Sequence, residues 1–200
     1  MRFRYSGRPP KQLLWLLLGR DMAASGVAEL GIDVGCGPMN NRPYFRSERY
    51  IGVDLDVERL VGGRRRFPEA LAVAMRIEQD CGIAGDFVLC VQMFVNRHFP
   101  AEQTLAAARA LVQMTRPGGT LIFNIARRNL PWESDIDRLL QGTFDDVHKF
   151  RYGVLSGRDF GPLATPIALA TLALPVLRRG DQADKVYYRC RGKISGKEQP

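Results

Sequence analysis

The segment Leu30-Gly-Ile-Asp-Val-Gly-Cys-Gly-Pro38 constrains the fold of this chain more than any other. Ile32 and Val34 favour a β-strand. Gly35 and Gly37 follow at once, and glycine allows the backbone to turn sharply or to approach a ligand closely. In an open parallel sheet, a strand that runs into such a turn forms a ligand site at its carboxyl end. The segment therefore predicts a parallel α/β sheet with a binding site at this turn.

A carboxylate follows at a spacing that suits a nucleoside. Asp54 ends a second apolar run, Tyr50-Ile-Gly-Val-Asp54, nineteen residues after Gly35. An acidic residue about 20 residues beyond such a glycine turn accepts hydrogen bonds from ribose hydroxyls. The two features together predict a ligand that contains a ribose.

Strands and helices are predicted to alternate along one domain that spans residues 1–200. This alternation favours a doubly wound, mostly parallel sheet. We predict a basic, extended arm over residues 1–10 and a short helix within 38–45. The predicted strands are 28–34, 50–53, 70–75, 87–91, 120–125, 147–152 and 186–190, and the predicted helices are 11–25, 57–66, 101–114 and 133–141.

The net charge and the cysteines limit the possible ligands and partners of the protein only in part. The net charge of +8 is compatible with nucleic acid, an anionic membrane or an acidic substrate. The four cysteines form no Cys-x-x-Cys pair and stand beside no histidine cluster, so no metal site is predicted. Cys90 and Cys190 lie in apolar runs and are predicted to be core residues. The apolar run 13–18 is shorter than the ~7–15 residues of a signal-peptide core, so we expect a packed helix there and a cytoplasmic protein.

Four motifs now stand in a recognisable order over residues 28–126. They are Asp33-Val-Gly35-Cys-Gly37, Gly52-Val-Asp54-Leu-Asp56, Gly85-Asp86-Phe-Val-Leu-Cys-Val-Gln-Met-Phe94, and Arg116-Pro-Gly-Gly119 followed by Thr-Leu-Ile-Phe. In order and spacing the chain resembles the class I S-adenosylmethionine-dependent methyltransferases. The resemblance implies a Rossmann-like, doubly wound α/β fold, with a mostly parallel seven-stranded sheet and an antiparallel last strand. It also implies S-adenosyl-L-methionine as the cofactor and methyl transfer as the reaction.

The resemblance assigns cofactor-binding roles residue by residue. The glycine turn would approach the methionine part of the cofactor, and Asp33 beneath it would orient the turn or reach the cofactor's amino group. Asp54 would bind the ribose, and Leu55 would lie against the adenine. The acid that commonly ends the third strand is replaced by Ala74-Met75-Arg76, so an apolar or backbone contact from Met75 is expected instead. The expected cofactor-binding set is Asp33, Gly35, Cys36, Gly37, Asp54, Leu55, Met75 and Gln92, the last at the cofactor–substrate junction.

Several alternatives remain open. A dinucleotide such as NAD would also use a glycine turn and a distant acid, but Asn40 stands where that fold needs a third small residue. Val95-Asn96 replaces the common Glu-His after the fourth strand, which leaves a non-catalytic cofactor-binding protein as an alternative. His98 is a better candidate base than His148 because it follows the fourth strand, but no catalytic residue is assigned. Asn96 and Arg97 are further substrate-side candidates.

The segment 161–179 is the most unusual part of the sequence. Sixteen residues from Pro162 carry no charge, and three prolines interrupt them. We expect an apolar insertion that caps the substrate pocket, or an interfacial surface for a lipid-linked acceptor, with Arg178 and Arg179 facing anionic headgroups. A small-molecule or lipid-linked acceptor is therefore favoured. RNA is the minor alternative, because no aromatic residues interleave the arginine groups 64–66, 127–128 and 178–179.

Overall fold

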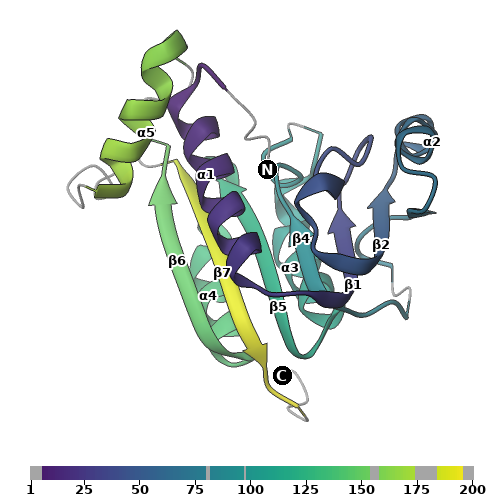
Figure 1. Ribbon diagram of the computed structural model, residues 1–200. Helices are drawn as coiled ribbons and strands as arrows, with labels where there is room; N and C mark the ends of the chain where they lie inside the picture. The colour runs from purple at the N-terminus through teal and green to yellow at the C-terminus, as the bar shows by residue number, and fades with distance from the viewer. Residues whose placement is uncertain (1–5, 80–81, 97, 154–157, 174–183, 196–200) are drawn as a thin grey trace.

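A computed structural model describes residues 6–79, 82–96, 98–153, 158–173 and 184–195. Seven strands form one sheet in the order β3-β2-β1-β4-β5-β7-β6 (Figure 1). β1, β2, β3, β4 and β5 pair in parallel, whereas β7 is antiparallel to both β5 and β6. The predicted mostly parallel seven-stranded sheet with an antiparallel last strand is confirmed. The strands are β1 Ala28–Val34, β2 Ser47–Asp54, β3 Leu71–Ala74, β4 Gly85–Cys90, β5 Thr115–Ala126, β6 Phe144–Tyr152 and β7 Lys185–Lys193.

Helices cover both faces of this sheet (Figure 1). One face packs against α3 (Thr104–Gln113) and α4 (Glu133–Gln141), and the other against α1 (Pro9–Ala24). α2 (Val57–Arg66) follows β2, and α5 (Ala164–Ala173) lies beside α1. Among the described residues, no helix is long and apolar enough to cross a membrane.

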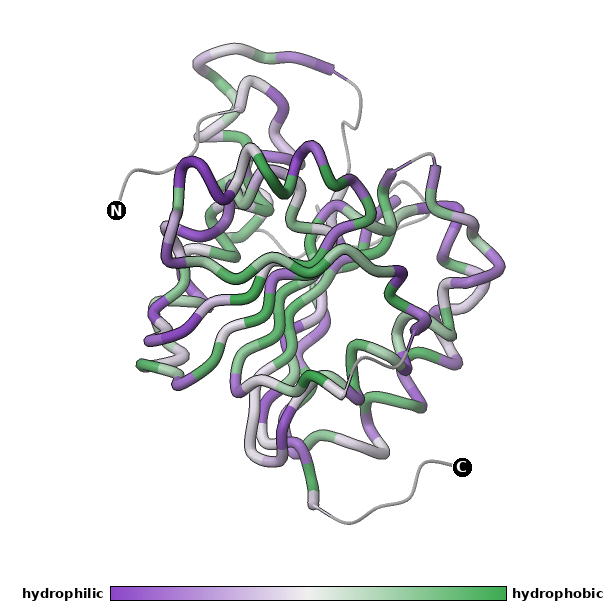
Figure 2. Tube along the Cα trace, turned by 90° about the vertical axis from the view of Figure 1, so that its right-hand side faces the viewer, coloured by the Kyte–Doolittle hydropathy of each residue, from purple (hydrophilic) through white to green (hydrophobic). Residues whose placement is uncertain are grey.

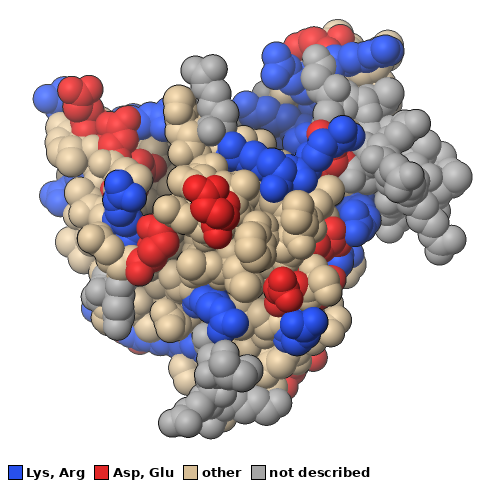
Figure 3. All heavy atoms as spheres, turned by 180° about the vertical axis from the view of Figure 1, so that it is seen from behind, with Lys and Arg blue, Asp and Glu red and all other residues tan. Residues whose placement is uncertain are grey.

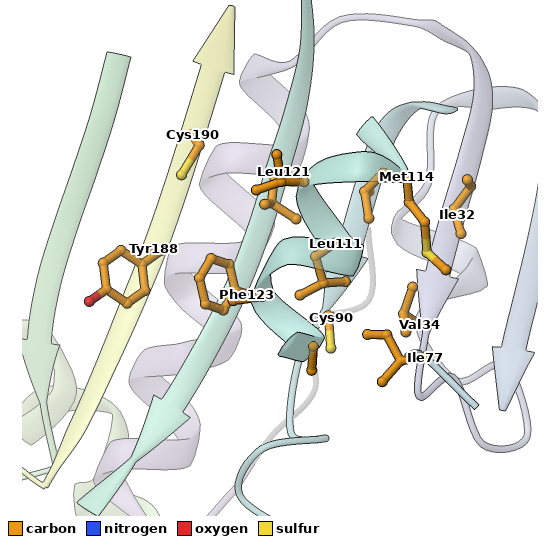
Figure 4. Close-up of a cluster of buried hydrophobic side chains, with 14 of the residues drawn as sticks. Ile32, Val34, Ile77, Cys90, Leu111, Met114, Leu121, Phe123, Tyr188 and Cys190 are labelled. Atoms are coloured by element: carbon orange, nitrogen blue, oxygen red, sulfur yellow. The ribbon is translucent and has the colours of Figure 1, made fainter. Parts of the chain in front are cut away.

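The core is divided between the two faces of the sheet. Hydrophobic residues concentrate along the central strands (Figure 2). On the α3 face, Cys90, Leu111 and Phe123 point into one shared space (Figure 4) and are fully buried. Cys190 is also fully buried, so the prediction that Cys90 and Cys190 are core residues is confirmed. Buried strands of this kind are expected where helices cover both faces of a parallel sheet.

α1 is apolar on more than the single face predicted for residues 11–25. Leu13 and Trp15 are buried as well as Leu14, Leu17 and Leu18. The reason is that α1 lies between the sheet and α5, so both of its sides are covered. α1 also begins at Pro9, because proline is favoured in the first helical turn, so the last two residues of the predicted arm belong to the helix.

The short helix predicted within 38–45 is present as the 3-10 turn Arg42–Tyr44. One further boundary differs from the prediction. β5 begins at Thr115 instead of residue 120, so the Arg116-Pro-Gly-Gly119 turn lies inside the strand. The pairing between β4 and β5 shifts register at Gly85–Phe87, and Gly118 has a φ of 74°. A bulge with a left-handed glycine lets the strand continue through the turn sequence.

Candidate functional site

The carboxyl ends of β1 and β4 mark the point where the strand order reverses, which is where open α/β sheets bind ligands. Gly35 and Gly37 follow β1 with φ values of 67° and 53°, which favour glycine. The Gly35 N–H donates to the carbonyl oxygen of Val53 at 2.8 Å, and the Cys36 N–H donates to the same oxygen at 3.1 Å. The glycine turn is thus fixed against the end of β2.

Asp54 connects the glycine turn to the start of α2. Its Oδ2 accepts the Gly37 N–H at 2.6 Å, and its Oδ1 accepts the Asp56 N–H at 3.0 Å. Asp56 in turn caps α2 by accepting the Arg59 N–H at 3.0 Å. A carboxylate has about four lone-pair sites, so each oxygen of Asp54 keeps capacity for one ribose hydroxyl.

An apolar surface lies next to this carboxylate. Leu55 is 63% exposed, which is high for a leucine. A shallow groove of about 390 Å³ runs between α2 and the edge strand β3, and Val57 and Ala74 are among its lining residues. The Met75 N–H donates to the Asp54 carbonyl oxygen at 3.2 Å, which brings the end of β3 to the same place. These residues form an apolar surface beside the Asp54 carboxylate.

Asp33 lies beneath the turn rather than on its surface. The side chain is fully buried; its Oδ1 accepts from Asn41 Nδ2 at 3.2 Å, and its Oδ2 accepts from the Tyr50 hydroxyl at 2.9 Å. Burial raises the pKa of the Tyr50 hydroxyl, and the Asp33 carboxylate raises it further, so Tyr50 stays protonated as a donor. The carboxylate therefore joins β1, the segment after the glycine turn and β2.

The thiol of Cys36 belongs to the protein interior. Its side chain is buried, and Sγ donates to the Gly37 carbonyl oxygen at 3.4 Å. Burial raises the pKa of the thiol, and the carboxylates of Asp33 and Asp54 add to this effect, so a reactive thiolate is disfavoured. Within the described residues, no group of three or more His, Cys, Asp or Glu side chains could hold a metal ion.

Met39 packs the segment after the glycine turn onto α2. It has a left-handed backbone, with φ of 54°, and a fully buried side chain. A Cβ at Gly63 would lie only 2.7 Å from Met39 Cγ, so this position in α2 accommodates glycine alone without a shift. In dinucleotide-binding folds, a third glycine in the turn allows close packing between the strand and the helix. Here the glycine that allows the close packing is Gly63 of α2, and the residue after the turn is Met39.

Gly62 and Gly63 therefore form a matched pair for substitution. Gly62→Ala should stabilise the protein by about 0.5–1 kcal/mol, because a Cβ there meets nothing within 4 Å and alanine favours the helix. Gly63→Ala should cost about 1–2 kcal/mol by overpacking against Met39. Urea denaturation measures both changes. If both alanine variants are equally stabilised, the Met39 side chain moves aside at no cost, and its packing on Gly63 does not hold the glycine turn in place.

The end of β4 completes the site. Gln92 has a φ of 70°, and its N–H donates to Asn124 Oδ1 at 2.8 Å. Asn124 Nδ2 donates to the Tyr152 hydroxyl at 3.0 Å, and both side chains are fully buried. A Cβ on Gly35 would lie 3.0 Å from Met93 Cβ, so the residues after β4 contact the glycine turn. A left-handed non-glycine residue held by buried partners is a strained feature that often marks a functional site.

The structure separates the two histidines. His98 lies on an exposed loop after β4, where its N–H donates to Asn96 Oδ1 at 3.1 Å. His148 lies within β6, paired with Arg189 of β7, and burial and the charges of Arg189 and Arg20 lower its pKa. Arg97 lies outside the described residues. His98 thus shares the edge of the glycine turn, but the geometry assigns no base.

Sequence reasoning did not identify Asn41, Tyr50, Asn124 and Tyr152, which hold the site from below. Asn124 had one sequence signal, because it is a polar residue inside the apolar run Leu-Ile-Phe-Asn-Ile. Asn41 and Tyr50 had none, because their partner Asp33 is eight and 17 residues away in the chain.

Comparisons with known proteins show what this fold is similar to. No protein-family model matches the sequence, and no curated protein matches it. The N-methyltransferase NodS from Bradyrhizobium japonicum WM9 superposes with a TM-score of 0.62 at 16% identity, covering 92% of this chain and 97% of that one. Its complex with S-adenosyl-L-homocysteine gives a TM-score of 0.61 at 17% identity, over 88% and 84% of the two chains.

Two further solved structures extend the comparison. A TehB-like S-adenosylmethionine-dependent methyltransferase from Corynebacterium glutamicum ATCC 13032 gives a TM-score of 0.60 at 13% identity, over 88% of this chain and 87% of that one. The (4+2)-cyclase SpnF gives a TM-score of 0.57 at 13% identity, over 96% and 86%. The chain therefore has the Rossmann-like fold of the class I methyltransferases.

Proposed function

We propose that this protein binds S-adenosyl-L-methionine at the glycine turn and transfers its methyl group to a small-molecule or lipid-linked acceptor. The observation that carries the proposal is Asp54, which is anchored by two backbone N–H groups between the glycine turn and α2, with the exposed Leu55 beside it. This arrangement suits a nucleoside whose ribose binds the carboxylate and whose base contacts the leucine. NodS offers a precedent, since its structure was solved with S-adenosyl-L-homocysteine.

The roles of the remaining residues follow from their places around the turn. S-adenosylmethionine supplies a methyl group that is already activated on a sulfonium, so the main task of the protein is to place an acceptor in line with it. The glycine turn would admit the methionine part of the cofactor. Gln92 would face the junction between cofactor and acceptor, held there by Asn124. Asp33 would keep the turn in place from below.

A role other than methyl transfer is the second candidate. The specific observation in its favour is the similarity of the fold to SpnF, a protein described as a cyclase. Acidic and basic side chains are interspersed over much of the face seen from behind (Figure 3), so this face does not favour RNA.

Calorimetric titration of the native protein with S-adenosylmethionine, S-adenosylhomocysteine and NAD tests the cofactor. We expect binding of the two sulfur compounds in the micromolar range, about −8 kcal/mol, and none of NAD. Binding of NAD alone would refute the proposal. An acceptor screen that measures S-adenosylhomocysteine production then tests the reaction, and tight cofactor binding without turnover on any acceptor would favour the second candidate.

A further inference from the structure

The outer face of α5 is apolar and uncovered. Residues 160–173 carry no charge, and α5 buries only Ala164 and Ala168. Leu163, in the 3-10 turn Gly161–Leu163 just before α5, is 61% exposed, and Leu169 on α5 is 51% exposed. The exposed residues recur at helical spacing on one side, namely Pro162, Leu163, Pro166, Leu169 and Ala173. A surface helix ordinarily presents polar residues to water, so this contiguous apolar stripe suits contact with another apolar phase.

Basic side chains border the stripe. The Phe160 N–H donates to the Gly7 carbonyl oxygen at 2.7 Å, which ties the chain before α5 to the start of α1. Exposed Arg8 just before α1, exposed Lys11 in its first turn and exposed Arg158 therefore lie at this end of the molecule. The nearby acid in the same segment is Asp159, whose Oδ1 accepts the Gly161 N–H at 2.9 Å. Cations at one end of an apolar stripe match the chemistry of an anionic lipid surface.

The stripe also lies at the same edge of the sheet as the candidate site. β7 is antiparallel to both β5 and β6, so β5 and β6 run in the same direction. The connection from β6 to β7, which contains α5, therefore leaves the sheet at the edge where β1 and β4 end (Figure 1). A flat surface that contacts α5 would meet the molecule on its ligand-binding side.

We infer that α5 and the first turn of α1 dock on an anionic bilayer, with the apolar stripe in the interface and the bordering cations on the headgroups. A second copy of the chain is a poorer occupant, because a two-fold contact through α5 would bring the same cations together. The docking is independent of the methyl transfer proposed above, so either can fail without the other.

Sedimentation of the full chain with vesicles at low salt tests the docking. We expect the native protein to bind phosphatidylcholine vesicles that contain phosphatidylglycerol, and to bind pure phosphatidylcholine weakly. The double variant Leu163→Asp/Leu169→Asp should lose at least about tenfold in binding, since both side chains enter the apolar phase. The matched control is Leu71→Asp, an exposed leucine on β3 that is 55% exposed, and it should bind as the native protein does.

Two further measurements test the contributions of charge and of self-association to the binding. Lys11→Gln/Arg158→Gln should reduce the preference for anionic vesicles while leaving the apolar stripe intact, and 0.5 M salt should act likewise. Failure of the native protein to sediment with anionic vesicles would overturn the inference, as would unchanged binding of the leucine double variant. Light scattering that shows a lipid-free dimer abolished by that variant would assign the stripe to a second copy instead.

Discussion

Replacing Asp54 with alanine is expected to weaken S-adenosylhomocysteine binding by roughly a hundredfold or more. A hydrogen bond to a charged group contributes about 1.5–3 kcal/mol, and the carboxylate has free acceptor capacity for both ribose hydroxyls. The substitution also releases the Gly37 N–H, which Asp54 Oδ2 accepts at 2.6 Å, so the glycine turn keeps only its two hydrogen bonds to the Val53 carbonyl oxygen of β2. Calorimetric titration of the native protein and the variant measures the change.

Asp56→Ala is the matched control for this prediction. Asp56 is the next acid along the same loop, and it caps α2 through the Arg59 N–H. Its removal should lower the free energy of unfolding by about 1 kcal/mol, the usual cost of an N-cap, while cofactor affinity changes only a few-fold. If Asp54→Ala binds S-adenosylhomocysteine as tightly as the native protein does, the carboxylate does not contact the ribose.

The parts of the fold with a strong periodic signal could be predicted from the sequence. The spacing of Ile136, Leu139 and Leu140 predicts a helix near 133–141, and α4 spans Glu133–Gln141 with Ile136 and Leu140 fully buried. The start of β5 could not be predicted, because Pro117-Gly-Gly119 is a turn signal, and Thr115 before it joins the strand only through its pairing with Gly85 of β4. The burial of a second side of α1 depends on α5, which begins 140 residues after α1 ends.

The candidate site likewise contains residues that could be predicted from the sequence and residues that could not. The glycine turn and Asp54 have a local signature, and the structure brings them together through the Gly37 hydrogen bond. Tyr50 reads from sequence as an ordinary strand residue, and its role as a buried donor to Asp33 exists only once β1 and β2 are paired. The left-handed backbone of Gln92 has no sequence signal either, since glutamine rarely adopts it.

Asp33→Ala is expected to lower the free energy of unfolding by about 3 kcal/mol. The carboxylate is fully buried and accepts from Asn41 and Tyr50, and its removal leaves these two donors without that acceptor at a cost of about 1–3 kcal/mol each. In a chain of this size the midpoint of thermal unfolding should fall by roughly 6–12 °C. Urea denaturation and a thermal melt measure the two quantities.

Two conservative variants separate a structural role of Asp33 from contact with the cofactor. Tyr50→Phe removes one donor and leaves the carboxylate, so it should cost about 1 kcal/mol with nearly native affinity for S-adenosylhomocysteine. Asp33→Asn keeps the shape of the side chain but places an amide where one of the two donors now points. If Asp33→Asn abolishes binding while keeping native stability, the carboxylate reaches the cofactor's amino group. If stability and affinity fall together, Asp33 acts by holding the glycine turn, as its two buried hydrogen bonds indicate.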